Sequence, residues 1–154
     1  MSNIYKFKFS KSSFELSDDY DRLSDIDKER IADMDVHSYV DFEENDEYSF
    51  FIITESTEIE KYIEILLDNL ISFEYKDITT DVLKSKYDIE DKISSIVDPL
   101  ASGKYSLFMD DLDEWIYDNL DIDIVLDRIS DVGMESLKKV EKEFLKNYKS
   151  LWKK

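Results

Sequence analysis

The sequence predicts an α+β fold, in which a small antiparallel sheet packs with four to six helices in the C-terminal two-thirds of the chain. Apolar and polar residues alternate in the N-terminal third, as in strands. From Thr57 onward, apolar residues recur at three- and four-residue steps, as in amphipathic helices. The 154 residues include only two Gly and one Pro, which disfavours loop-rich all-β folds. This length fits a single domain that covers residues 1–154.

Three alternating segments predict the sheet. Residues 3–10 form a half-buried strand, and residues 11–16 allow a short hairpin with it. Residues 36–42 and 48–54 flank a five-residue polar run and therefore predict an antiparallel hairpin, whose second strand is apolar enough to be central. The faces expected to be buried carry Tyr5, Phe7 and Phe9 in the first strand, opposite Ile4, and Val36, Ser38, Val40 and Phe42 in the second.

Two helices are predicted around this hairpin. Residues 18–35 have a narrow apolar stripe, typical of a surface helix that begins near Ser24. Residues 57–73 are the clearest predicted helix, and Thr57 and Glu60 have the spacing of a capping box. A core-facing stripe of normal width is formed by Ile59, Ile63, Leu66, Leu67 and Leu70.

The remaining helices follow without long loops. They cover residues 80–97 with a break near Asp88, residues 106–120 with Ser106 as N-cap, and residues 134–154. Residues 121–132 fit a strand or a helix, and we favour a helix because the neighbouring segments are helical. Gly133 is typical of a helix C-terminus.

Charge is the most unusual property of the chain. The formal net charge is −18 and the sequence pI is about 4.3. Residues 18–60 hold sixteen acidic side chains against three basic ones, whereas residues 133–154 hold seven Lys against three Glu. Such a protein repels free nucleic acid and anionic membranes, and it attracts basic proteins. The Lys-rich C-terminal face is expected to be solvated.

Several function classes lack their sequence signals. The chain has no Cys, and it shows neither a secretory signal nor an apolar run long enough to span a membrane, so we expect a cytoplasmic protein. Calcium loops starting at Asp19 or Asp121 would need Gly at Ser24 or Leu126. The only histidine, His37, has no catalytic partner motif, and no phosphate-binding Gly-rich loop is present. We therefore expect no enzyme activity, no cofactor and no metal.

The candidate partner-binding residues are acidic clusters with neighbouring aromatics, which supply anchors in many interfaces. They are Asp18, Asp19, Asp21 and Asp25 in the first predicted helix; Tyr39, Glu43, Glu44, Asp46, Glu47 and Tyr48 in the hairpin and its four-carboxylate loop; and Asp110, Asp111, Asp113 and Glu114 in the helix after Ser106. In that helix, acids near the N-terminus would also be favoured by the helix dipole.

The charge predicts a function. A net charge of magnitude about 2–8 keeps a small domain soluble, so −18 exceeds what solubility requires. Carboxylates on a rigid surface can imitate the phosphates of DNA. The expected function is inhibition of a basic partner, such as a nuclease, by a DNA mimic of phage or mobile-element origin, of the anti-CRISPR or anti-restriction type. An immunity protein against a basic toxin and a helical adaptor module are the alternatives.

Overall fold

The computed structural model describes residues 2–9, 21, 23–44, 47–94 and 103–152. The N-terminal half of the chain contains a four-stranded antiparallel sheet with strand order β2-β3-β1-β4. The strands are β1 (Ser2–Phe9), β2 (Val36–Glu44), β3 (Glu47–Glu55) and β4 (Phe73–Asp77). The predicted α+β class and the central place of the second hairpin strand, β3, are confirmed. The predicted hairpin over residues 11–16 lies outside the described residues.

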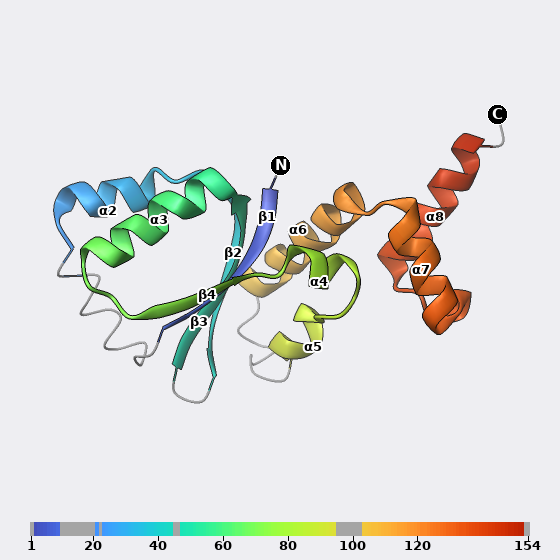
Figure 1. Cartoon of the computed structure of the whole chain (residues 1–154), viewed down its shortest axis with the longest axis horizontal. Helices are drawn as coiled ribbons and strands as arrows, with labels where there is room; N and C mark the ends of the chain where they lie inside the picture. The colour runs from blue at the N-terminus through green and yellow to red at the C-terminus, as the bar shows by residue number, and fades with distance from the viewer. Residues whose placement is uncertain (1, 10–20, 22, 45–46, 95–102, 153–154) are drawn as a thin grey trace.

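Helices cover the sheet and extend beyond it (Figure 1). They are α2 (Asp25–Ala32), α3 (Ser56–Asp68), α4 (Thr79–Leu83), α5 (Ile89–Ser94), α6 (Gly103–Asn119), α7 (Ile122–Val132), the 3₁₀ turn η2 (Met134–Ser136) and α8 (Lys139–Trp152). The six helices from α3 to α8 lie in the C-terminal two-thirds, as predicted. The preferred helical assignment of residues 121–132 is also confirmed, because α7 spans Ile122–Val132 with its C-cap at Gly133 (φ 82°).

The sheet buries side chains on both faces. On one face, aromatic residues of β1 and β3 pack under α3, together with residues near α2. On the other face, a larger cluster continues from the sheet through α4 and α6 to α7 and α8. Tyr5, Phe7 and Phe9 share one face, as predicted, and this face packs under α3; Ile4 is fully buried on the opposite face. The prediction of a half-buried first strand is therefore wrong at Ile4.

A β-bulge changes the face of one predicted core residue. The pairing between β2 and β3 shifts between Val36 and Ser38. Val40 and Phe42 pack toward α6, whereas Val36 packs on the α3 side. Strict alternation would place all three on one face, but the extra residue of the bulge reverses the side-chain direction at this point.

The hairpin loop is shorter than predicted. Glu43 pairs with Tyr48 and Glu44 with Glu47, so both glutamates belong to β2 and Glu47 belongs to β3. Only residues 45–46, which are outside the described part, separate the two strands. The prediction of a five-residue loop with four carboxylates at its tip is therefore wrong, because strand pairing continues past Phe42.

The helix predicted over residues 57–73 ends earlier, at Asp68. Its last predicted residue, Phe73, begins β4, an edge strand that the sequence analysis missed. The capping box is not formed either, since the N-cap is Glu55 without a side-chain cap. A different glutamate of the first turn, Glu58, accepts a hydrogen bond from the Asp35 backbone N–H at 3.2 Å.

Two further helix boundaries differ from the predictions. α6 begins at Gly103, so Ser106 lies inside the helix and is not its N-cap. The long C-terminal helix is interrupted, because η2 precedes α8 and Leu137 adopts an extended backbone between them. Ser24 is confirmed as the N-cap of α2, and its hydroxyl accepts a hydrogen bond from the Asp27 backbone N–H at 3.1 Å.

The elements are arranged along the longest axis of the molecule (Figure 1). The sheet with α2 and α3 occupies one end, α4, α5 and α6 lie in the middle, and α7 and α8 form the other end. Among the described helices, none combines the length and apolarity needed to cross a bilayer.

Candidate partner-binding surface

The outer edge of β2 carries the aromatic part of the candidate surface. β2 is an edge strand of the described sheet, where it pairs with β3 alone. Tyr39 is 53% exposed on this strand, and Asp41 is exposed as well. An exposed tyrosine combines a large apolar ring with a polar hydroxyl, the pairing of properties that interface anchors use.

A tyrosine–aspartate contact orders this edge. The Tyr48 hydroxyl donates a hydrogen bond to Asp41 Oδ2 at 3.0 Å, between diagonal neighbours of the hairpin. Burial raises the pKa of Tyr48, and the Asp41 carboxylate raises this pKa further, with smaller contributions from Tyr62 and Tyr39. Tyr48 therefore stays protonated and holds the Asp41 carboxylate in place. The sequence analysis missed Asp41, although the predicted hairpin pairing places it across from residues near Tyr48.

The helix α2 provides one acidic flank. Asp21 and Asp25 are exposed, and Asp25 lies in the first turn of α2. Asp27 in the same turn has structural contacts, because the Asn69 side chain donates a hydrogen bond to Asp27 Oδ2 at 3.1 Å. This hydrogen bond is the main reason why the pKa of Asp27 is lowered. The predicted residues Asp18 and Asp19 lie outside the described residues.

The helix α6 provides the second acidic flank. Asp110, Asp113 and Glu114 are exposed, and Asp111 is half-buried. The opposite side of the helix is buried in the core, with Phe108, Leu112, Trp115 and Ile116 as predicted. The acids lie beyond the first turn of α6, which contains no acidic residue, so the helix dipole does not explain them. Burial, and then the charge of Asp110, raise the pKa of Asp113 against the opposing effect of Lys138 and Lys139.

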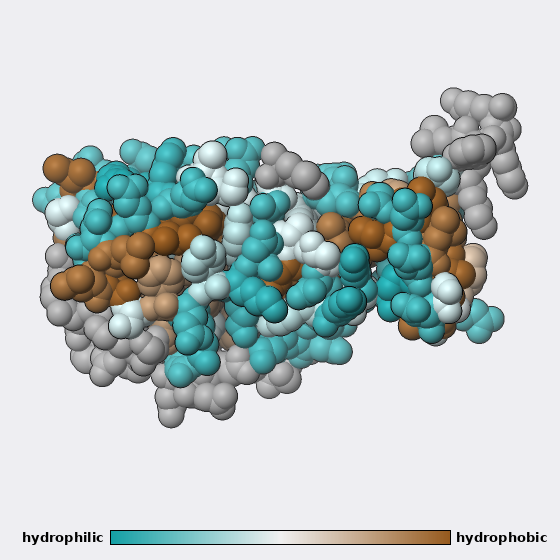
Figure 2. Space-filling model, in the orientation of Figure 1, coloured by the Kyte–Doolittle hydropathy of each residue, from teal (hydrophilic) through white to brown (hydrophobic). Residues whose placement is uncertain are grey.

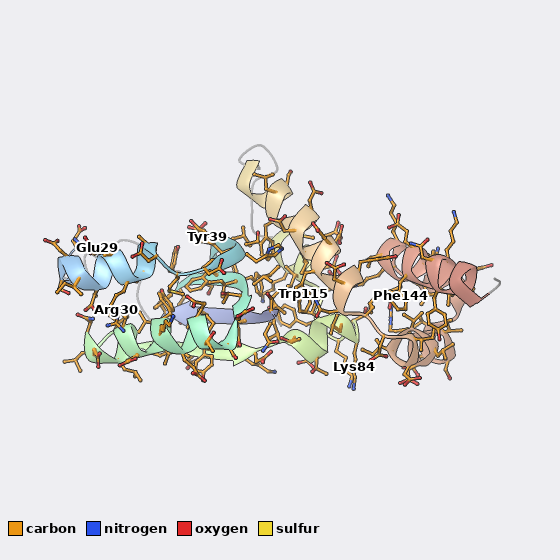
Figure 3. The ribbon with its side chains drawn as sticks, turned by 90° about the horizontal axis from the view of Figure 1, so that it is seen from above. Glu29, Arg30, Tyr39, Lys84, Trp115 and Phe144 are labelled. Carbon is orange, nitrogen blue, oxygen red and sulfur yellow. The ribbon has the colours of Figure 1, made fainter. Side chains whose placement is uncertain are left out.

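The two acidic flanks lie on the same side of the molecule. In Figure 3, α2, the strand that carries Tyr39, and α6 follow one another along one side, and α3, β4 and α4 lie along the other. Close packing of α6 against β2 fixes part of this arrangement. We call α2, the outer edge of β2 and the exposed acids of α6 the acidic side. Its predicted members within the described side chains are Asp21, Asp25, Tyr39, Tyr48, Asp110, Asp111, Asp113 and Glu114.

Glu47 of the hairpin is not part of this surface. Glu47 forms an ion pair with Lys8, with Oε2 and Nζ 2.8 Å apart, and it projects from the face of β3 opposite to Tyr48. The side chains of Glu43 and Glu44, and the whole of Asp46, lie outside the described part of the structure.

The described residues do not bring together three His, Asp or Glu side chains that could hold a metal ion. His37 is exposed next to the β2 bulge. Comparisons with protein-family models, with curated proteins and with solved structures returned no match to this chain.

Proposed function

We propose that this protein is an inhibitor-type binding protein, whose acidic side occupies a basic, nucleic-acid-binding site on a partner protein. The observation that carries the proposal is the placement of α2, with the exposed Asp25 in its first turn, and of α6, with its exposed acids, on either side of a strand edge that exposes Tyr39 (Figure 3). Charged flanks provide long-range attraction to a basic groove, and a central aromatic side chain provides apolar contact area.

The charge of the acidic side also supports this proposal. A net charge of −18 destabilises a compact fold through self-repulsion, and the acids of α6 gain no stability from the helix N-terminus. A basic partner would offset this cost by pairing with the carboxylates. Duplex DNA carries one charge per roughly 1.7 Å of axis, so a protein built to hold DNA presents a matching density of Lys and Arg.

The proposed partner is a nuclease or another nucleic-acid-handling protein, and the proposed site of action is the cytoplasm, where such proteins work on their substrates. A phage or mobile-element inhibitor of a host defence nuclease fits this description. An immunity protein against a basic toxin would use the same surface, and the identity of the captured partner distinguishes the two. The proposal includes no direct contact with nucleic acid or membrane.

Affinity capture from a cell lysate at low and high salt tests the proposal. We expect a basic partner to bind at about 50 mM salt and to be lost at about 500 mM, since salt screens exposed charges. The purified protein should then displace a labelled DNA or RNA from this partner. A partner that binds equally at both salt concentrations, or that keeps its nucleic acid, would contradict the proposal.

A matched pair of triple variants locates the interaction. Asp21→Asn, Asp25→Asn and Asp110→Asn together remove three charges from the acidic side. The control removes three exposed charges from the side of α3 and β4, with Glu60→Gln, Asp68→Asn and Glu74→Gln. We expect the first variant to slow association and to reduce nucleic-acid displacement, and the control to associate as the wild type does. Equal slowing in both would assign the effect to net charge and not to the acidic side.

One observation favours the adaptor as a second candidate. Ile26, Leu67 and Leu70 are exposed where α2 meets the C-terminal end of α3, and Figure 2 shows apolar surface at this end of the molecule. Leu70 is 90% exposed and adopts a left-handed backbone with φ 56°. An adaptor would bind its partner through this apolar area, and this binding would persist at high salt. Leu70→Asn, which tolerates the same backbone, should weaken that interaction and leave salt-sensitive binding unchanged.

A further inference from the structure

A groove lies between α4, α5, α6 and α8, away from the strand edge that carries Tyr39. Its volume is about 560 Å³, which is within the range of ligand-binding sites. The floor is formed by apolar side chains of the larger hydrophobic cluster. The floor residues are Val82, Ile89, Met109, Leu112, Ile116 and Val140. These side chains come from four helices, so the groove is a product of tertiary packing.

The rim of the groove is acidic. Five carboxylates line it, from three helices or their N-terminal ends, against two lysines. The carboxylates are those of Asp88, Glu90, Asp113, Glu114 and Glu143, and the lysines are Lys138 and Lys139. Lys138 is already 3.7 Å from Asp88 Oδ2, and Asp88 Oδ1 accepts a hydrogen bond from the Asp91 backbone N–H. The rim therefore keeps a net negative charge beside an apolar floor.

We infer that this groove binds a basic amphipathic segment of the partner protein, in which an apolar side chain is flanked by Lys or Arg. An uncharged apolar ligand would leave the rim carboxylates without a cationic partner in the ligand. An inorganic cation would make no apolar contact with the floor. An apolar anchor between cationic side chains matches both parts of the groove. This inference rests on the proposed function, since it specifies the chemistry of the same basic partner.

α6 connects the groove to the acidic side. Asp113 and Glu114 line the groove, while Asp110 lies one turn earlier on the same helix and acts electrostatically on Asp113. One partner can therefore contact the strand edge of β2 with its basic groove and insert a neighbouring segment between α5, α6 and α8. The inserted segment would add apolar contact area, which is less sensitive to salt than the ion pairs of the acidic side.

A defined peptide tests this inference. The probe is a 14-residue amphipathic helix of Leu and Lys, and its control replaces every Lys by Glu. In heteronuclear NMR spectra of the ¹⁵N-labelled full chain, we expect the Lys peptide to shift amide signals of α5, α6 and the start of α8. The Glu peptide should shift none of them. Binding of the Glu peptide in the same place, or shifts confined to α2 and β2, would overturn the inference.

Variants separate this site from the acidic side. Glu90→Gln with Glu143→Gln, two exposed rim changes outside the acidic side, should weaken binding of the Lys peptide by roughly 2- to 30-fold, as expected for two partly exposed ion pairs. The matched control, Asp127→Asn with Asp131→Asn, removes two exposed charges of α7 outside the groove and should leave the affinity unchanged. Val140→Trp should block the groove; circular dichroism checks that this variant is folded.

The outcomes distinguish the two proposals. A peptide that binds in the groove, combined with failure of the intact protein to displace nucleic acid from any captured partner, would overturn the proposed function only. Nucleic-acid displacement that survives both Glu90→Gln with Glu143→Gln and Val140→Trp would overturn the groove inference only.

Discussion

Arg128 in α7 and Glu141 in α8 form a buried ion pair, with Nε and Oε2 3.3 Å apart and Glu141 only 1% exposed. The second carboxylate oxygen of Glu141 accepts a hydrogen bond from the Lys138 backbone N–H at 2.9 Å. Glu141 thus satisfies an open donor at the start of α8 and fixes α8 against α7. Among the ion pairs between described residues, this one has the carboxylate that is least exposed to water.

Removal of this carboxylate should destabilise the fold. Glu141→Ala leaves the Arg128 guanidinium partly buried without its partner and the Lys138 N–H without an acceptor, so we expect a loss of about 3 kcal/mol in the free energy of unfolding. Urea denaturation followed by circular dichroism measures it. Glu143→Ala, an exposed change in the same helix, serves as the control and should stay within about 0.5 kcal/mol of the wild type. Equal losses would refute the structural role of the pair.

Helix capping provides a second test, because the sequence and the structure disagree about it. The Asp121 side chain accepts a hydrogen bond from the Ile124 backbone N–H at 2.8 Å and caps α7, whereas Thr57 forms no capping box in α3. Asp121→Ala should therefore cost about 1 kcal/mol of stability. Thr57→Ala should change stability by less than about 0.5 kcal/mol. The reverse order in denaturation experiments would support the sequence-based capping box.

The difference between prediction and structure follows the range of the interactions involved. The β2–β3 hairpin and the inward face of α6 were predicted, because residue periodicity is a local property of the chain. The predicted face of α3 is only partly correct: Ile59 and Leu66 are buried, but Leu67 and Leu70 are exposed. β4 was missed: it is short and charged, and only pairing with the distant β1 makes Phe73–Asp77 a strand. The bulge at Val36 and Ser38 has no Gly or Pro to mark it. The acids of the candidate site were named from the sequence, but their placement on one side depends on how α6 packs against β2.

The acids of α6 should reduce stability at neutral pH. The pKa of Asp113 is raised, first by burial and then by Asp110, so the native state binds this proton more tightly than the unfolded chain does. The free energy of unfolding therefore falls as the pH rises from the ordinary carboxyl pKa through the raised pKa of Asp113. Asp113→Asn removes the effect and should raise the melting temperature at pH 7. The gain should vanish at a pH below the ordinary carboxyl pKa of about 4, where Asp113 is protonated in both states.

Thermal melts between pH 3 and pH 7 check this prediction. Asp118→Asn, an exposed change of the same charge on the same helix, provides the comparison. A stability gain for Asp113→Asn that is independent of pH, or one that Asp118→Asn reproduces, would contradict the assigned cause. A pH-dependent gain would indicate that the chain keeps a destabilising carboxylate at this position, as binding and catalytic sites often do.

The anchor role of Tyr39 is the most direct test of the acidic side. Tyr39 is 53% exposed at the edge of β2, and Tyr75 is 51% exposed on β4, so the two tyrosines are matched in exposure but lie in opposite edge strands. Tyr39→Ala should reduce the affinity for the captured partner by about 2 kcal/mol, or roughly 30-fold, as for a central interface aromatic. It should change the folding stability little, because the side chain is largely in water.

Tyr75→Ala should behave in the opposite way. Its ring stacks on Phe7 with centroids 5.5 Å apart, so its removal should lower the folding stability while the partner affinity stays unchanged. Calorimetric titration of the partner and urea denaturation of both variants measure the two effects separately. If Tyr75→Ala weakened the partner as much as Tyr39→Ala did, the binding surface would lie on the β4 edge or would extend around the sheet, and the acidic side would no longer account for the interaction.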